Sequence, residues 1–136
     1  MSKILALDFG EKRTGIAVTD DLQIIASGLT TVLTKDLLDF LKNYFSNEKV
    51  ELIIIGLPKR MDNSFSEIEN SILEFIKQLE IQVPDIPIKR IDERFTSKLA
   101  LQSMIESGMK KKDRRNKANL DEISATIILQ SYLYYK

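Results

Sequence analysis

The first twenty residues restrict what this chain can fold into more than any other segment does. Residues 3–9 form a mainly apolar run that carries Asp8 near its end, and Gly10 follows it. A second run with β-strand composition covers residues 14–19. Two such runs joined by a glycine turn predict neighbouring strands with Asp8 at the edge of a sheet. An acid in that position can also serve only to close the turn through its side chain.

Two more acids fall at the ends of predicted elements. Glu93 follows the strand expected over residues 86–92, and Asp121 lies in the first turn of the last predicted helix. An acid in the first turn of a helix stabilises the helix dipole by roughly 0.3–1 kcal/mol at a surface site, which is an alternative role for Asp121. Three carboxylates at element ends are also what a site for a hard divalent metal ion needs. Asp8, Glu93 and Asp121 are therefore candidate metal ligands and catalytic residues.

The rest of the chain alternates between strand and helix patterns. We expect further strands over residues 24–31, 50–56 and 86–92, and Pro87 restricts the last of them to the sheet edge or to a late beginning. The expected helices are one capped by Thr34, one opened by a capping box of Ser66 and Glu69, one between Thr96 and Gly108, and one capped by Asn119 with Glu122. This order predicts an α/β fold in a single domain, residues 1–136. Its mixed five-stranded sheet has three antiparallel strands, then parallel crossovers, with helices on its faces.

Composition excludes several kinds of chemistry. The chain has 136 residues, of which 43% are hydrophobic, so it can build a core, but it has no histidine and no cysteine. This excludes Ser-His-Asp and Cys-His catalysis and the usual structural zinc sites. Carboxylates, hydroxyls, lysines and an oxygen-preferring metal remain. No apolar segment approaches the roughly 20 residues that span a bilayer, and no signal sequence opens the chain, so we expect a cytoplasmic protein without a membrane partner.

The net charge of zero hides an uneven distribution. Residues 110–117, the basic segment, hold six of the 20 basic residues and one of the 20 acids, a local charge of +5. The remainder holds fourteen basic and nineteen acidic residues, or −5. A basic segment on an acidic body indicates a site for a polyanion, although a solvated segment without a partner would have the same composition. Its basic residues are Lys110, Lys111, Lys112, Arg114, Arg115 and Lys117.

Four motifs carry a family resemblance. They are Asp8-Phe-Gly-Glu-Lys-Arg-Thr-Gly15, Ile55-Gly-Leu-Pro58, Asp92-Glu-Arg-Phe-Thr96 and Asp121-Glu-Ile-Ser-Ala125. In these motifs the chain resembles the YqgF-type family, small Holliday-junction-resolvase-like proteins regarded as pre-16S ribosomal RNA nucleases, over about residues 3–133. The chain departs from the family at Asn63, where Gly is usual, and at Ser124, where Ala is usual. The resemblance implies a ribonuclease H-like fold.

The resemblance also implies a function. It implies a metal-dependent endonuclease that hydrolyses phosphodiester bonds in structured nucleic acid, with the 5′ end of pre-16S rRNA in ribosome biogenesis as the expected substrate. The implied cofactor is Mg²⁺ or Mn²⁺, held by Asp8, Glu93 and Asp121. Strand alternation alone leaves Asp92 open as the ligand in place of Glu93, since adjacent strand residues point to opposite faces; the resemblance favours Glu93. The candidate contacts to the nucleic-acid backbone are Lys12, Arg13, Arg94 and the basic segment.

Other functions fit the same motifs. A Holliday-junction resolvase acting on DNA would use the same acids, and a nucleic-acid-binding factor in ribosome assembly or transcription would keep the fold with little or no cleavage. An actin-like phosphotransferase also begins with a strand, an Asp and a Gly, but it needs two such domains. The expected partners are therefore pre-rRNA or branched DNA, and ribosomal particles. Apolar residues near the C-terminus leave room for a homodimer contact: Leu129, Tyr132, Leu133, Tyr134 and Tyr135.

Overall fold

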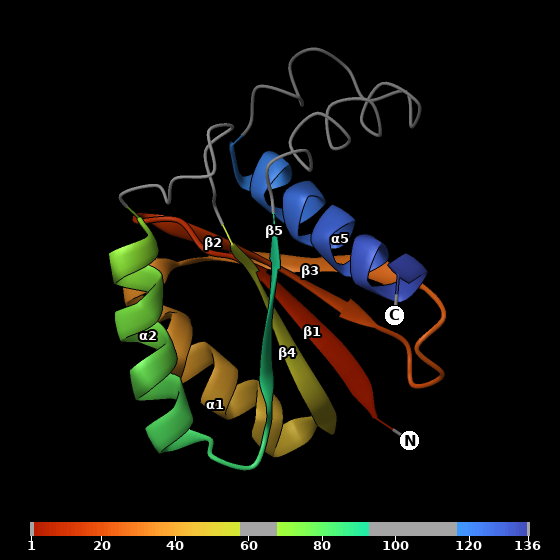
Figure 1. The fold of residues 1–136 in the computed structure, drawn as a ribbon, viewed down its shortest axis with the longest axis horizontal. Coiled ribbons are helices and arrows are strands. Elements are labelled where there is room, and N and C mark those ends of the chain that lie inside the picture. Colours follow the sequence, from red (N-terminus) through yellow and green to blue (C-terminus); the bar gives the residue numbers. More distant parts are fainter. Residues whose placement is uncertain (1, 58–67, 93–116, 136) are drawn as a thin grey trace.

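The computed structural model describes residues 2–57, 68–92 and 117–135, with the side chains of the last helix described from 122 to 134. One sheet lies between two layers of helices (Figure 1). In chain order the elements are β1 (Lys3–Asp8), β2 (Arg13–Thr19), β3 (Ala26–Leu33), the 3-10 turn η1 (Thr34–Asp36), α1 (Leu37–Asn47), β4 (Val50–Leu57), α2 (Glu69–Gln82), β5 (Ile88–Asp92) and α5 (Lys117–Tyr135). The expected helix between Thr96 and Gly108, and the departure at Asn63, lie outside the described residues.

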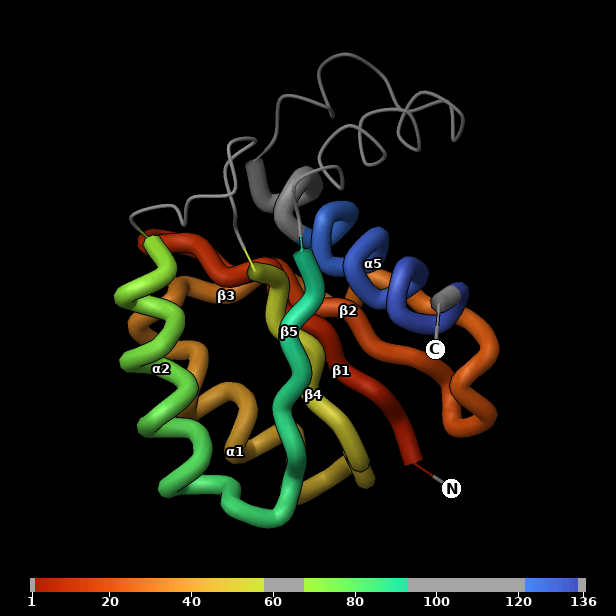
Figure 2. Tube along the Cα trace, in the orientation of Figure 1, coloured from red at the N-terminus to blue at the C-terminus, as the bar shows by residue number. Residues whose placement is uncertain are grey.

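The five strands form a mixed sheet in the order β3-β2-β1-β4-β5. β1 and β3 are both antiparallel to β2, which lies between them. The chain then crosses over twice, so that β4 is parallel to β1 and β5 is parallel to β4; this path can be followed in Figure 2. The predicted fold class is confirmed. β5 lies at the sheet edge and begins just after Pro87, whose carbonyl accepts a 3.0 Å bond from the Ile53 amide.

The two faces of the sheet carry different cores, because successive strand residues point to opposite faces. The face covered by α1 and α2 holds large side chains, including Leu5, Leu7, Ile16, Ile53, Ile55, Ile72 and Leu79. The face covered by α5 combines large side chains such as Ile4 and Ile54 with three alanines, Ala6, Ala17 and Ala125, whereas the other core has no alanine among its described residues. Small side chains let the helix lie close to the sheet: a Cβ added to Gly28 on β3 would lie 3.4 Å from Thr126 Oγ1 on α5.

The apolar end of α5 is mostly used in this packing. Leu129 is fully buried against the sheet, and Tyr132 and Leu133 contact the same core. Leu129 is therefore not available for the expected homodimer contact, whereas Tyr132 and Leu133 are partly buried and Tyr134 is 81% exposed. Among the described helices, none is long and apolar enough to cross a membrane.

Two predicted boundaries near β3 are wrong because side chains make other bonds. The strand expected from residue 24 begins at Ala26, since the preceding residues belong to a turn organised by Asp20. Thr34 does not cap α1. It begins η1, and the N-cap of α1 is Asp36, which makes no side-chain capping bond.

The predicted starts of α2 and α5 are also wrong. The N-cap of α2 is Ile68, and the Glu69 carboxylate binds Arg90 of β5 instead of the helix backbone. Ser66 lies outside the described residues. α5 begins at Lys117, so Asn119 is a helical residue and not its cap. In both helices the pattern predicted the element correctly and its first residue incorrectly.

Candidate active site

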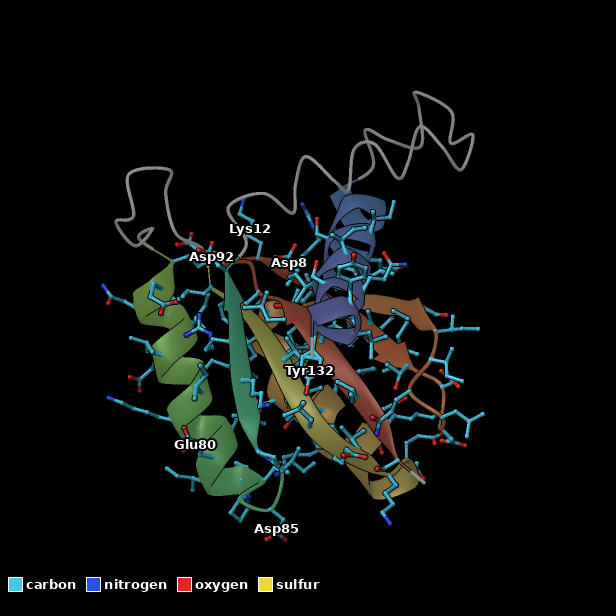
Figure 3. All side chains as sticks on the ribbon, turned by 45° about the vertical axis from the view of Figure 1, so that its right-hand side comes forward. Asp8, Lys12, Glu80, Asp85, Asp92 and Tyr132 are labelled. Atoms are coloured by element: carbon cyan, nitrogen blue, oxygen red, sulfur yellow. The ribbon has the colours of Figure 1, made fainter. Side chains whose placement is uncertain are left out.

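Asp8 is the last residue of β1, and its register partner on β2 is Gly15. Because β1, β4 and β5 are parallel, their carboxyl ends meet at one edge of the sheet, which we term the carboxyl edge. Asp92 ends β5 at this edge. Figure 3 shows Asp8, Lys12 and Asp92 at the same end of the molecule. The carboxyl edge therefore gathers charged groups from separate parts of the chain.

The alternation along β1 assigns Asp8 to the face covered by α5. Ala6 belongs to the core beneath α5, and Leu7 belongs to the core beneath α1 and α2. By the same alternation, Asp8 points to the same face as Ala6, and Phe9 points to the same face as Leu7. The Phe9 ring centroid lies 5.4 Å from that of Phe75 on α2, as this assignment requires. α5 begins at the same end of the sheet (Figure 1), so the carboxylate lies on the face that the start of this helix covers.

The same alternation separates Asp92 from Asp8. On β5, Ile91 contacts the core beneath α5, whereas Arg90 binds a side chain of α2. Asp92 is therefore assigned to the face of α2, opposite to that of Asp8. The adjacent acid, Glu93, lies outside the described residues. The sequence pattern left the faces of β5 open, and the contacts of its neighbours decide the face of Asp92.

Arg90 is a residue of this edge that the sequence analysis missed. Its guanidinium donates to both Glu69 carboxylate oxygens, at 3.1 and 2.7 Å. It also donates to the carbonyls of Ile55 and Gly56 on β4, at 3.2 and 3.0 Å. Both side chains of the pair are largely buried, with 21% of Arg90 and 10% of Glu69 exposed. A signal was present, because Lys89 and Arg90 are adjacent in a strand and one of the two charges must face the α2 side.

At the start of α5, Glu122 lies over β3. Its carboxylate accepts a 3.5 Å bond from the Thr31 hydroxyl, and its Cβ lies 3.5 Å from where a Gly28 Cβ would be. The predicted capping role of Glu122 is therefore wrong, because the side chain faces the sheet. The side chain of Asp121 lies outside the described residues, but its backbone is in α5, four residues before the fully buried Ala125.

The expected nucleic-acid contacts are only partly within the described residues. Lys12 is exposed in the turn after β1, and Arg13 is half-buried at the start of β2, so both lie beside Asp8. Arg94 and residues 110–116 lie outside the described residues, and Lys117 is described only as the first helical residue of α5.

The donor chemistry of this edge fits a hard metal ion. The described side chains contain no group of three carboxylates that could hold a metal, but that set excludes Glu93 and Asp121. Asp8 contributes a carboxylate, the ligand that Mg²⁺ and Mn²⁺ prefer. The sequence offers no imidazole or thiolate that would select a softer metal.

Comparison with known proteins identifies the family. The family described as "RuvX: Holliday junction resolvase" matches residues 2–135. The chain belongs to this family. It is 61% identical over 134 residues to the "Putative pre-16S rRNA nuclease" of Christiangramia forsetii, covering 98% of this chain and 99% of that protein. It is 62% identical over 136 residues to the protein of the same name from Phocaeicola vulgatus, covering 100% and 98%.

Solved structures agree on the fold. The fowlpox virus Holliday junction resolvase superposes with a TM-score of 0.56 at 16% identity, covering 98% of this chain and 99% of that chain. T. thermophilus RuvC, solved in complex with a Holliday junction substrate, superposes with a TM-score of 0.55 at 12% identity, covering 99% of this chain and 98% of that chain. The ribonuclease H-like fold is thus confirmed. Membership of the RuvX family confirms the resemblance seen in the motifs and the enzyme class, a hydrolase acting on phosphodiester bonds.

Proposed function

We propose that this protein is a metal-dependent endonuclease that processes the 5′ end of pre-16S rRNA in ribosome biogenesis. The assignment of this substrate rests on sequence identity of 61% and 62%, over nearly the whole chain, to relatives named for that nuclease. Residues 1–136 act as one nuclease domain in the cytoplasm, with pre-rRNA and ribosomal particles as partners.

The site we propose consists of Asp8, Glu93 and Asp121, which together hold Mg²⁺ or Mn²⁺. The contacts of β5 support Glu93. They assign Asp92 to the face opposite Asp8, and adjacent strand residues point to opposite faces. Of the two acids that follow Ile91, Glu93 is then the one suited to join Asp8.

Helix geometry supports Asp121. In a helix of 3.6 residues per turn, positions 121 and 122 lie about 40° and 60° to opposite sides of position 125. Ala125 faces the sheet, and Glu122 lies to its β3 side. Position 121 is then on the other side, toward β1, the strand that ends in Asp8. This supports the assignment of Asp121, and not Glu122, to the site.

The chemistry follows from the residue types. Three carboxylates that lie close together repel one another. A divalent cation bound between them relieves this repulsion, which favours its binding. When bound, such a cation activates water for attack and stabilises the charge that develops on the phosphate. The protein's own residues hold the cation and orient the backbone. Lys12, Arg13, Arg94 and the basic segment contact phosphates, which positions a strand without reading its sequence.

A second candidate is cleavage of branched DNA. The family is described as a Holliday junction resolvase, and T. thermophilus RuvC, which shares the fold, was solved with such a junction. Both substrates present a phosphodiester backbone, so the same three acids serve either one. Discrimination between them would come from shape and from the ribose 2′-hydroxyl.

The test is a cleavage panel with a matched inactive variant. Labelled RNA spanning the 5′ end of 16S rRNA, an unstructured RNA and a four-way DNA junction are incubated with the protein in Mg²⁺, Mn²⁺ or EDTA. Asp8→Asn protein, purified identically, controls for host nucleases. We expect metal-dependent cleavage near the mature 5′ end, absent in EDTA and in the variant. Preferential cleavage of the junction would favour the second candidate, and cleavage of no substrate would favour a non-catalytic assembly factor.

A further inference from the structure

Two threonine hydroxyl groups, hydrogen-bonded in series, hold the turn that follows Asp8, and we term them the Thr14–Thr34 hydroxyl chain. Thr34, the first residue after β3, donates its hydroxyl to the Gly10 carbonyl at 2.5 Å. Its amide donates to the Lys12 carbonyl at 2.9 Å. The Thr14 and Thr34 hydroxyl oxygens are 2.9 Å apart. One residue from the end of β3 therefore holds two carbonyls of the loop that connects β1 to β2.

The direction of the hydrogen bonds in the Thr14–Thr34 hydroxyl chain follows from the number of protons that each hydroxyl can donate. A threonine hydroxyl has one proton to donate and two lone pairs that accept. Since Thr34 gives its proton to Gly10, the proton between the two hydroxyls must come from Thr14. Thr14 is fully buried, so its hydroxyl is shielded from water and depends on a protein partner.

The turn that these bonds hold is tight. A Cβ on Gly10 would lie 2.4 Å from the Arg13 carbonyl oxygen, which is closer than atoms can approach without a shift of the backbone. The turn connects Asp8 to the exposed Lys12 within four residues. A small rotation of this turn would move both the carboxylate and the ammonium group.

The two threonines do not themselves belong to the site. Thr14 is two residues before Ile16, whose side chain lies in the core beneath α1 and α2, so Thr14 is on the face opposite Asp8. We propose that the Thr14–Thr34 hydroxyl chain is a positioning device, which fixes the turn so that Asp8 can ligate metal and Lys12 can contact nucleic acid. This inference rests on the proposed role of Asp8 in the nuclease site.

The test compares isosteric variants. Thr34→Val removes the bond to Gly10 and leaves the size of the side chain almost unchanged, Thr34→Ser restores the hydroxyl, and Thr30→Val on β3 is the matched control. In metal-free protein we expect the amides of residues 10–13 to exchange at least about 10-fold faster in Thr34→Val. We also expect the Mn²⁺ affinity, measured by calorimetry, and kcat to fall about 10- to 100-fold, as when an outer-shell partner of a metal ligand is lost.

The controls separate positioning from general stability. Thr34→Ser should recover most of the Mn²⁺ affinity, and Thr30→Val should match the wild type. If Thr34→Val does not fold, Thr14→Val keeps the Thr34–Gly10 bond and should give a smaller loss in the same direction. Suppose that the wild type is active and that Thr34→Val or Thr14→Val binds Mn²⁺ with the same affinity as Thr30→Val. This result would overturn the positioning role and leave the proposed function unaffected. A wild type that neither binds Mn²⁺ nor cleaves would instead contradict the proposed function.

Discussion

Asp8 and Asp20 occupy similar places in the sequence and are used differently in the structure. Asp8 is the last residue of β1 and Asp20 is the first residue after β2, and each precedes a connection to the next antiparallel strand. In the second connection the Asp20 carboxylate accepts bonds from the amides of Leu22, Ile24 and Ile25, at 3.2, 2.9 and 2.8 Å. In the first connection the turn carbonyls are bonded by Thr34, from outside the turn.

The difference shows how a strand-end acid can be assigned a role. The Asp20 carboxylate organises its own loop, which is the structural role that the sequence pattern also allowed for Asp8. The turn after Asp8 is held from outside by Thr34, whose hydroxyl and amide donate to the Gly10 and Lys12 carbonyls. We therefore expect substitution of Asp8 to affect chemistry and substitution of Asp20 to affect stability.

The largest expected effect is that of Asp8→Asn. We expect cleavage to fall by more than about 100-fold, beyond the range for loss of an outer-shell partner, because the variant removes a proposed metal ligand. Stability should be retained or increased, because one of three repelling carboxylates becomes neutral. Single-turnover cleavage and thermal unfolding measure the two effects. An Asp8→Asn protein that unfolds more easily and cleaves normally would give Asp8 the role we assign to Asp20.

The second comparison uses the adjacent acids after Ile91. Glu93→Gln should be nearly inactive, and Asp92→Asn should keep most of the wild-type rate, because Asp92 is on the opposite face from Asp8. The two variants differ by one position and lose the same charge, so each controls for the other. Measuring kcat and Mn²⁺ affinity for both decides the assignment. The reverse ranking would make Asp92 the ligand and leave the other two acids unchanged.

Much of the fold was predictable because it depends on local pattern. Apolar runs and turn residues indicated the five strands and their order, since these are properties of neighbouring residues. The errors occurred where a side chain found a partner far along the chain. Thr34 binds Gly10, 24 residues away, and Glu69 binds Arg90, 21 residues away, so neither serves as the helix cap that its local sequence favours.

The site was predictable to a smaller extent. The position of Asp8 follows from a single apolar run that ends at a turn. The face of Asp92 does not, because its strand carries charges at both Lys89 and Arg90. Only their contacts show that Arg90 faces α2 and Lys89 faces Tyr132 of α5. Ile24 and Ile25 gave a false strand signal. They are 67% and 63% exposed, and their amides bind Asp20.

A third comparison tests the glycine turn itself. Gly10→Ala places a Cβ 2.4 Å from the Arg13 carbonyl oxygen, so the backbone must move. We expect a loss of roughly 1–3 kcal/mol in the free energy of unfolding, as for other overpacked sites, together with reduced cleavage. Gly28→Ala is the matched control, since its added Cβ would make contacts of 3.4–3.5 Å and cost little. Equal stability of the two variants in urea unfolding would show that the turn after Asp8 is not tightly constrained.

The smallest expected effect is the pH dependence that Asp20 contributes. Bonds from the Ile25 and Ile24 amides hold the pKa of Asp20 below its ordinary value of 3.8. A carboxyl whose folded pKa is lowered stabilises the protein above its unfolded pKa, and this contribution is lost as the pH falls through the folded pKa. Asp20→Asn should therefore be less stable than the wild type at neutral pH, and the gap should narrow as the pH falls below 3.8.

Urea unfolding across this pH range measures the gap, and Asp21→Asn controls for the change in net charge. Cleavage at neutral pH by folded Asp20→Asn should equal that of the wild type, because Asp20 lies at the opposite end of β2 from the turn that follows Asp8. A gap in stability that stays constant with pH would mean that the amide bonds to Asp20 do not depend on its charge. Loss of cleavage in this variant would mean that the two loops are coupled through the sheet, and the separation of roles between Asp8 and Asp20 would then be wrong.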